Sequence, residues 1–312
     1  MAPSAEFGAN HPSNLKTTLH LSQQAPDTFR QLGKPLVQLS TFNQQGSDDF
    51  DTLEKLFFSC IQSADDESAL LCLEHLTNRF GSSNEKVMAL RGLYDEATAE
   101  NQARLERCLN NYDDILSRNP VNLPILKRRA SVLRSLSRPS DAISCVVQLL
   151  DAVPTDVEAW CELAELYHSQ GMSPQAIFSL EEALLIVPHA WTVHARLGEI
   201  SYIFARSLEG EAMSRSLSLS IRHFCRSVEL CDDYLRGFYG LALATTPSLV
   251  TRIPETSRDG LKKKETIERL HSTALRKLQE TLSTQYSRKP HLREYEENEL
   301  SVVKELLGQS SK

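Results

Sequence analysis

Three glutamates and a histidine on one predicted helix are the residues of this sequence whose types and spacing could do chemistry. Glu158, Glu162, Glu165 and His168 recur every three or four residues, which places them on about one face of a helix. The step from Glu165 to His168 is Glu-x-x-His, the spacing with which di-iron helical bundles aim two ligands at one metal. The sequence therefore poses a choice between a metal site and an exposed binding surface.

Composition favours a polypeptide partner over nucleic acid. Acidic residues outnumber basic ones by 41 to 34, giving a net charge of -7, whereas affinity for phosphate backbones requires clustered Lys and Arg. The seven cysteines form no C-x-x-C pair, a scatter typical of a reducing compartment. Because no apolar run reaches the ~18 residues of a membrane-spanning helix, we expect no direct membrane span.

Three prolines reveal the period of the chain. Pro120, Pro154 and Pro188 follow one another at intervals of 34 residues, and a fixed period of this length indicates repeated helical hairpins. The residues around them follow the tetratricopeptide signature, with a glycine in the turn between two helices, and we expect the ring of Trp160 to fill the core between repeats. Besides the three prolines, the frame residues are Trp160, Leu163, Ala164, Tyr167, Gly171, Ala176, Leu180 and Ala183.

This period predicts an all-α fold, a tetratricopeptide repeat superhelix (an α-solenoid) with C-terminal capping helices. We expect a polar and partly disordered segment over residues 1–48, an array of about five helical hairpins over 49–246, a loop over 247–263, and capping helices over 264–312.

One irregularity interrupts the array. The second helix after Pro188 arrives about ten residues late, after the Ser-rich stretch 207–220. We interpret that stretch as an insertion, and insertions in solenoids lie in loops at one edge.

Several stretches resemble one known family beyond the positions of the repeat frame. They are "EAWCELAELY" followed by "AIFSLEEALLIVPH", "SADDESALLCLEHLTNRF" leading into "VMALRGLYDEA", and "SIRHFCRSVELCDDYLRGFYGLAL". On these motifs, roughly residues 50–245 resemble the family of subunit 2 of the ER membrane protein complex, its cytosolic tetratricopeptide subunit, in a fungal-type version. The stretch 207–220 and the first 48 residues depart from the family pattern.

The resemblance implies a scaffold without catalytic residues, in a complex that inserts transmembrane helices, including tail anchors, into the ER membrane. The implied partners are the other subunits: membrane subunits through their cytosolic segments, and a soluble cytosolic subunit. The implied location is cytoplasmic, peripheral on the cytosolic face of the ER membrane through those partners. The alternative is a soluble tetratricopeptide adaptor that binds peptides of chaperones or degradation factors.

A groove is expected where the first helix of each hairpin lines the concave face of the array. The charges at its exposed positions change sign along the chain, which suits a polypeptide ligand. A solvated helix face also carries such charges, and this alternative stays open for each residue. The predicted groove residues are Lys127, Ser131, Arg134, Glu158, Glu162, Glu165, His168, Arg196, Glu199 and Tyr202.

Three kinds of ligand can be compared for this groove. Chaperone adaptors of this fold clamp terminal carboxylates with Lys, Asn and Arg, whereas Glu162 and Glu165 in the middle repeat would repel a carboxylate. The basic run "LKRRA", Lys127 to Arg129 with nearby Arg134, is expected to bind an acidic protein segment. Anionic lipid head groups would need several more such charges.

Catalysis and metal binding are not favoured. A second Glu-x-x-His step runs from Glu268 to His271. A di-iron site needs four helices around one centre. In a solenoid, however, the second step lies several repeats away from Glu165 and His168. Neither a G-x-S-x-G motif nor a Gly-rich phosphate loop is present. We therefore expect no enzyme activity, no metal and no cofactor.

Overall fold

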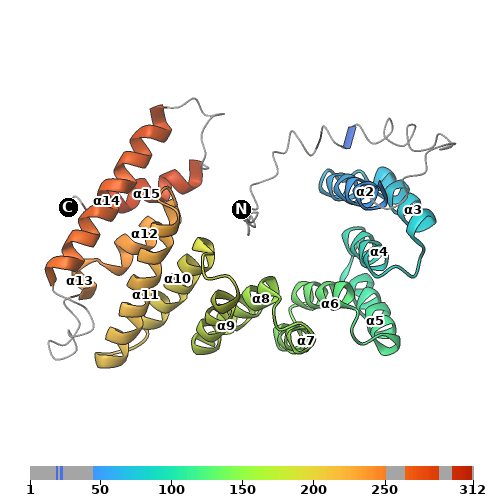
Figure 1. Ribbon diagram of the computed structural model, residues 1–312, viewed down its shortest axis with the longest axis horizontal. Coiled ribbons are helices and arrows are strands. Elements are labelled where there is room, and N and C mark those ends of the chain that lie inside the picture. Colours follow the sequence, from blue (N-terminus) through green and yellow to red (C-terminus); the bar gives the residue numbers. More distant parts are fainter. Residues whose placement is uncertain (1–18, 20–21, 24–44, 251–263, 288–296, 311–312) are drawn as a thin grey trace. The chain divides into compact units, whose positions relative to one another are not determined.

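The structure is a computed structural model that describes residues 19, 22–23, 45–250, 264–287 and 297–310, and within these ranges its regular elements are all α-helices (Figure 1). Most of the expected N-terminal segment 1–48 and of the expected loop 247–263 lies outside the described residues. In the described parts, helix begins at Gln45, before the expected boundary, and 247–250 form a short helix instead of loop. The helices are α2 (Gln45–Gln62), α3 (Asp66–Phe80), α4 (Glu85–Ala97), α5 (Gln102–Arg118), α6 (Leu123–Ser135), α7 (Pro139–Ala152), α8 (Val157–Ser169), α9 (Ser173–Ile186), α10 (Trp191–Arg206), α11 (Gly210–Leu230), α12 (Leu235–Ala244), α13 (Pro247–Val250), α14 (Lys264–Ser287) and α15 (Glu297–Ser310).

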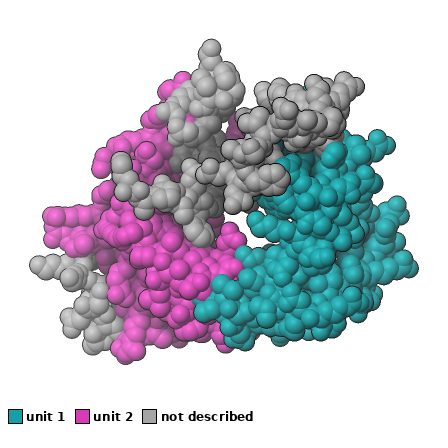
Figure 2. Space-filling view, turned by 45° about the vertical axis from the view of Figure 1, so that its right-hand side comes forward, with its two compact units in different colours: residues 1–154 teal, residues 155–312 magenta. Residues whose placement is uncertain are grey.

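The chain divides into two compact units, residues 1–154 and 155–312 (Figure 2). Unit 1 holds α2 to α7, and its core includes a cluster contributed by α2, α3 and α4. Unit 2 holds α8 to α15. Both units are built from consecutive helical hairpins of the tetratricopeptide type, so the fold class is the all-α solenoid class expected from the period. The buried residues of the α2–α4 cluster are Phe50, Leu53, Leu56, Phe57, Cys60, Ala69, Cys72, Leu73, Leu76, Val87 and Leu90.

The 34-residue period reappears in the ends of the helices. The N-cap residues of α6, α8 and α10 are Asn122, Asp156 and Ala190. The side-chain oxygens of Asn122 and Asp156 accept backbone N–H groups of the first turn, which stabilises a helix start. The turns of the two hairpins contain Ser137 and Gly171, both with positive φ (57° and 74°), so the same left-handed turn recurs one period later, with glycine removing the steric cost.

The interpretation of the Ser-rich stretch as a loop is wrong. From Gly210 onward its residues belong to α11, and Met213 and Leu217 are buried in the core of unit 2. The extra residues lengthen a hairpin: α10 has 16 residues where α6 and α8 have 13, and α11 has 21 where α7 and α9 have 14.

The serines of α11 hold it close to α10. Ser216, Ser220 and Ser227 lie on the face of α11 that packs against α10. Their hydroxyls donate hydrogen bonds of 2.8 Å to the carbonyl oxygens of Ser201, Gly198 and Trp191. Small residues allow two helix backbones to approach, and each hydroxyl finds its acceptor in the neighbouring backbone. The serine content is therefore a packing feature.

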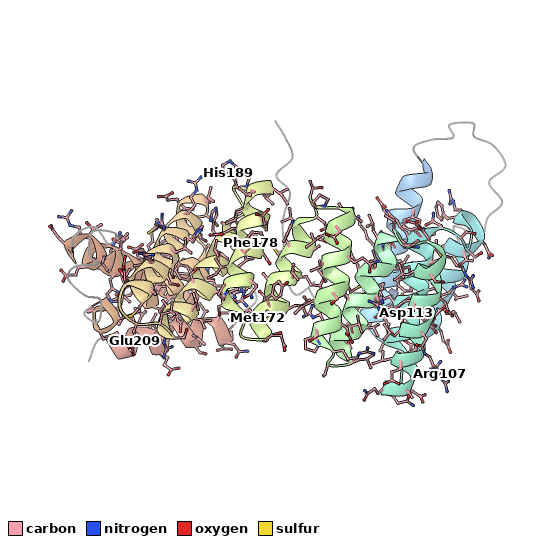
Figure 3. All side chains as sticks on the ribbon, turned by 90° about the horizontal axis from the view of Figure 1, so that it is seen from below. Arg107, Asp113, Met172, Phe178, His189 and Glu209 are labelled. Atoms are coloured by element: carbon pink, nitrogen blue, oxygen red, sulfur yellow. The ribbon has the colours of Figure 1, made fainter. Side chains whose placement is uncertain are left out.

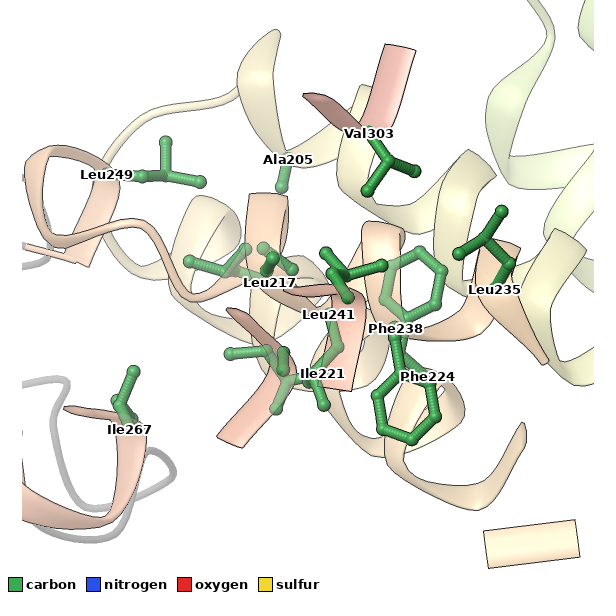
Figure 4. Packing of buried hydrophobic residues seen from close by; sticks show 14 of the residues in the cluster. Ala205, Leu217, Ile221, Phe224, Leu235, Phe238, Leu241, Leu249, Ile267 and Val303 are labelled. Carbon is green, nitrogen blue, oxygen red and sulfur yellow. The ribbon is translucent and has the colours of Figure 1, made fainter. Parts of the chain in front are cut away.

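Phe224 of α11 lies in the core of unit 2, among the buried residues shown in Figure 4. Its ring is 1% exposed. The Cα atoms of Gly198 in α10 and Gly240 in α12 lie so near the ring that a Cβ at Gly198 would approach it to 3.0 Å, and a Cβ at Gly240 would overlap it. Two glycines thus make room for one phenylalanine where three helices meet.

The C-terminal helices close the core of unit 2, as expected. Ile267, Ala274 and Leu278 of α14, with Leu300 and Val303 of α15, are buried in the same cluster as Phe224. They recur at helical spacing, so each helix presents one apolar stripe to the array and a polar face to solvent.

The ring of Trp160 is only half-buried, contrary to our expectation of a core residue. It packs edge-to-face against Phe178 of α9, with ring centroids 6.3 Å apart, and Phe178, labelled in Figure 3, is itself 54% exposed. The interior of the α8–α9 hairpin is filled instead by the frame residues Leu163, Ala164, Ala176, Leu180 and Ala183, each at most 3% exposed.

Candidate functional site

Four charged side chains form a ladder across the first helices of three consecutive hairpins. Arg196 of α10 donates two hydrogen bonds to Glu165 of α8, from Nε to Oε1 (2.5 Å) and from Nη2 to Oε2 (2.6 Å), and a third from Nη1 to Glu199 Oε2 (2.9 Å). Arg236 of α12 donates from Nη2 to Glu199 Oε2 (2.7 Å) and from Nε to Oε1. Bidentate arginine–carboxylate pairs fix geometry as well as charge, so the ladder sets the spacing of α8, α10 and α12.

The environment of the ladder favours its charged forms. Burial by itself lowers the pKa of Arg196, but hydrogen bonds to Glu165 and Glu199 raise it above its usual value. The pKa of Arg236 is likewise raised, chiefly by its hydrogen bonds to Glu199. Glu199 carries two guanidinium partners on a side chain that is only 19% exposed.

Three predicted groove residues, Glu165, Arg196 and Glu199, are therefore brought together as partners of one another. A reversal of charge at Glu165 would break the ladder as well as alter the surface. Among the other predicted residues of α8, Glu158 is exposed, while Glu162 and His168 are half-buried. The ring nitrogen Nδ1 of His168 is buried and has no hydrogen-bond partner in the described part of the chain.

The remaining predicted groove residues lie on α6 and at the far end of α10. Lys127 and Ser131 are half-buried, and the Ser131 hydroxyl donates to the Lys127 carbonyl (3.1 Å), whereas Arg134 is exposed. Tyr202 is half-buried against the core of unit 2, and the guanidinium of Arg206 lies 6.0 Å from the centre of its ring. The α6 residues belong to unit 1 and the others to unit 2.

A second charge cluster, in unit 1, was not predicted. Arg128 of α6 donates from Nε to Glu96 Oε1 of α4 (3.0 Å) and from Nη2 to Oε2. The hydroxyl of Tyr112 in α5 donates to the same Glu96 Oε1 (2.5 Å). Burial and the nearby Glu96 carboxylate raise the pKa of the Tyr112 phenol.

The basic run "LKRRA" thus finds acidic partners within its own chain. Arg128 pairs with Glu96, and Arg129 donates from Nε to Asp113 Oδ1 of α5 (2.7 Å). The expectation that this run binds a partner's acidic segment is weakened, because two of its charges are engaged. One sequence signal points to both charge networks: Glu96 and Arg128, Glu165 and Arg196, and Glu199 and Arg236 are separated by about one repeat.

In both Glu-x-x-His steps, one of the two side chains is bonded to another group of the protein. Glu165 is held by Arg196, and the Nδ1–H of His271 donates to the carbonyl oxygen of Ala242 (3.1 Å), with Thr245 Oγ1 at 3.2 Å. Across the described ranges, no three His, Cys, Asp or Glu side chains gather closely enough to hold a metal ion. The Glu-x-x-His spacing serves helix packing and charge pairing here.

A pair of histidines links α10 to α11. His194 Nε2 lies 3.1 Å from the carbonyl oxygen of Pro188, and its Nδ1 lies 3.0 Å from Nδ1 of His223. Since a carbonyl can only accept, Nε2 of His194 carries the proton, and its Nδ1 then accepts from His223. Burial, His194 and Arg222 lower the pKa of His223 to about 4, and burial foremost also lowers that of His194.

This pair predicts that unit 2 loses stability as the pH falls from about 6.5 towards 4. In this window the unfolded chain binds protons at His194 and His223 whereas the folded chain does not, so acid favours unfolding. The expected loss is about 2 kcal/mol by pH 4.5, reduced from the full shift because His223 is partly solvated. Urea unfolding at several pH values measures it, with His223→Gln flattening the dependence relative to wild type. The exposed His189→Gln is the matched control, and an unchanged slope in His223→Gln contradicts the assignment.

Comparison with known proteins agrees with this architecture. A family model described as "EMC2 TPR-like repeat domain" matches residues 71–217. The TPR repeat protein oca3 of Schizosaccharomyces pombe is 30% identical over 238 residues, 73% of this chain and 81% of its own. The ER membrane protein complex subunit 2-A of Xenopus laevis is 30% identical over 231 residues, 74% of this chain and 73% of its own. Subunit 2 of Saccharomyces cerevisiae is 24% identical over 61% of this chain and 66% of its own. On these relationships, the chain belongs to the ER membrane protein complex subunit 2 family.

Proposed function

We propose that this protein is a non-catalytic scaffold subunit of an ER membrane protein complex. The observation that carries the proposal is its 30% identity to the Xenopus laevis subunit over about three quarters of both chains. In this role it holds cytosolic segments of membrane subunits and contacts a soluble subunit, and it thereby supports insertion of transmembrane helices, including tail anchors. It lies on the cytosolic face of the ER membrane through these partners. None of the helices in the described ranges is both long and apolar enough to cross a bilayer.

The charge ladder supports a scaffold role. A scaffold must keep successive helices at a fixed spacing while it holds its partners. In a repeat protein each repeat contacts only the neighbouring repeats, so the rigidity of the array depends on each junction between repeats. Glu165, Arg196, Glu199 and Arg236 add bidentate pairs to the hydrophobic contact at two such junctions. The polar side chains of the first helices thus contribute to the stiffness of the array.

The same ladder argues against a chaperone adaptor. A carboxylate clamp needs cationic side chains that are available to the ligand. Arg196 instead directs all three of its donor nitrogens at Glu165 and Glu199. A ligand carboxylate would have to displace these two glutamates and would be repelled by their negative charge.

Purification of the tagged full-length protein from detergent-solubilised membranes tests the proposal. We expect several multi-spanning ER proteins to co-purify in stoichiometric amounts. Recovery of soluble chaperones alone would favour the adaptor and contradict the scaffold. A matched purification with Trp160→Ala, which alters a half-buried ring outside the ladder, controls for general loss of fold.

A further inference from the structure

A pocket of about 470 Å³ opens between α3 and α4 in unit 1. Its walls are two helical stripes. The α3 stripe recurs at spacings of three and four residues, as one face of a helix does, and the α4 stripe faces it in the same way. The lining residues are Leu70, Leu73, Glu74, Thr77 and Asn78 of α3, with Arg91, Tyr94 and Asp95 of α4.

The apolar part of this pocket lies on α3. Leu73 is buried and belongs to the core cluster of α2–α4, whereas Leu70 is 41% exposed beside it. An exposed leucine next to a cavity offers an aliphatic contact that the chain itself does not use. The pocket therefore has an apolar wall that extends to the protein surface.

The charged groups of the lining are two carboxylates and one guanidinium. Asp95 is half-buried, and burial raises the pKa of its carboxyl while Arg91 and Arg104 act in the opposite direction. Among the described residues, no donor forms a hydrogen bond or ion pair with the carboxylate of Asp95 or of Glu74. Arg91 directs Nη2 to Thr77 Oγ1 instead (3.3 Å). A carboxylate that is partly desolvated and lacks a direct partner gains from an added cation.

We propose that the α3–α4 pocket binds a partner's polypeptide segment that places a lysine or arginine side chain at Asp95 and Glu74 and an aliphatic side chain on Leu70 and Leu73. The charges favour a cation because the lining holds two carboxylates and one guanidinium, that of Arg91, which donates to Thr77. Arg104 also acts on Asp95 but is not a lining residue. The leucine wall selects a polypeptide over a small polyamine, since an aliphatic neighbour must fill it. This inference rests on the proposed function, in which the partners are protein segments.

Peptide titration monitored by leucine methyl NMR tests the pocket directly. The probe is the capped peptide acetyl-Gly-Leu-Lys-Leu-Gly-amide, and the same peptide with Glu in place of Lys is the comparison. We expect the Lys peptide to shift the methyl signals of Leu70 and Leu73 saturably, and to bind more weakly as salt screens the charges. Equal or stronger shifts with the Glu peptide would identify a site for acidic segments at Arg91 and overturn the proposal. Absence of shifts at millimolar Lys peptide overturns it as well.

Isosteric variants separate charge from shape. Glu74→Gln with Asp95→Asn is expected to weaken binding of the Lys peptide by at least ~tenfold, because each loses a charge-assisted hydrogen bond. Glu106→Gln with Asp114→Asn changes net charge equally at two exposed positions of α5 and should leave binding unchanged. Equal affinity of the two double variants contradicts the assignment.

Co-purification distinguishes failure of this inference from failure of the proposed function. If membrane subunits co-purify with the wild type but the Lys peptide does not bind, the pocket assignment fails and the scaffold role stands. If the peptide binds and no membrane protein co-purifies, the pocket assignment stands and the scaffold role fails. A photo-crosslinking residue in place of Leu70 in the assembled complex should yield an adduct whose partner peptide carries Lys or Arg beside an aliphatic residue, and an adduct lacking a basic residue counts against the site.

Discussion

Gly240→Ala is expected to lower the free energy of unfolding of unit 2 by about 3 kcal/mol, which is the range for overpacking a dense core. A methyl group at Gly240 would overlap the ring of Phe224, and a Cβ at Gly198 would approach the same ring to 3.0 Å. Phe224 is buried, at only 1% exposed, so we expect α12 or α11 to shift. Hydrogen exchange measured by mass spectrometry will show faster exchange in α10, α11 and α12.

The control for this substitution is Gly308→Ala in α15. No atom lies within 4 Å of a Cβ placed at Gly308, and alanine in a helix is more stable than glycine by about 0.5–1 kcal/mol. The two substitutions therefore have opposite expected signs. Adding Phe224→Leu to Gly240→Ala should recover part of the loss, because a smaller side chain relieves the overlap. A neutral effect of Gly240→Ala would show that the packing around Phe224 is looser than described.

The repeat frame could be predicted from the sequence because it is encoded by spacing. A period of 34 residues places Pro120, Pro154 and Pro188 two residues after the ends of α5, α7 and α9. It also anticipates buried small residues such as Ala164 and Ala176, since hairpins of equal length must pack in the same way each time. The repeat signature also places Gly171 in the turn between the two helices, and its φ of 74° agrees with that position.

The N-terminal half of α11 was not predicted, because serines make up much of its buried face, beside Met213 and Leu217. Composition alone makes "SLEGEAMSRSLSLS" resemble a loop. Ser216 and Ser220 are nevertheless compatible with a helix interface once the acceptors on α10 are present, and those acceptors are backbone carbonyls that carry no sequence signal. The leucines between the serines, Leu217 and Leu219, were the available hint, and Leu217 is fully buried.

Helical spacing placed Glu165, Arg196 and Glu199 on the first helices of their hairpins, which are α8 and α10. It did not predict that these charges pair with one another. Whether such charges face solvent or one another depends on the distance between neighbouring helices. The spacing of residues within one helix gives no information about that distance. Charges about one repeat apart with opposite sign, as in Glu165 with Arg196, are the feature that could have indicated pairing. Whether this surface also binds a partner stays a prediction.

The second large effect is expected from Glu96→Ala in unit 1. The side chains of Glu96 and Arg128 are only 11% and 24% exposed, and the Tyr112 ring is 1% exposed. Removing the carboxylate leaves a partly buried guanidinium and a buried hydroxyl without their shared acceptor, which typically costs about 3 kcal/mol or more. Urea unfolding, with hydrogen exchange in α4 to α6 as the local readout, measures the loss.

The neighbouring residue provides the control, because Arg129 makes an ion pair of the same kind at the surface. Asp113, its partner, has a side chain that is 48% exposed, and exposed pairs contribute only about 0–1 kcal/mol. Asp113→Ala should therefore have a small effect, although its pair also joins α5 to α6. Combining Glu96→Ala with Arg128→Met should recover part of the loss by removing the unpaired cation, since a buried charge is costly chiefly when its partner is missing. If Glu96→Ala and Asp113→Ala prove equally mild, water solvates Arg128 and Tyr112, and the cluster does not hold α4, α5 and α6 together.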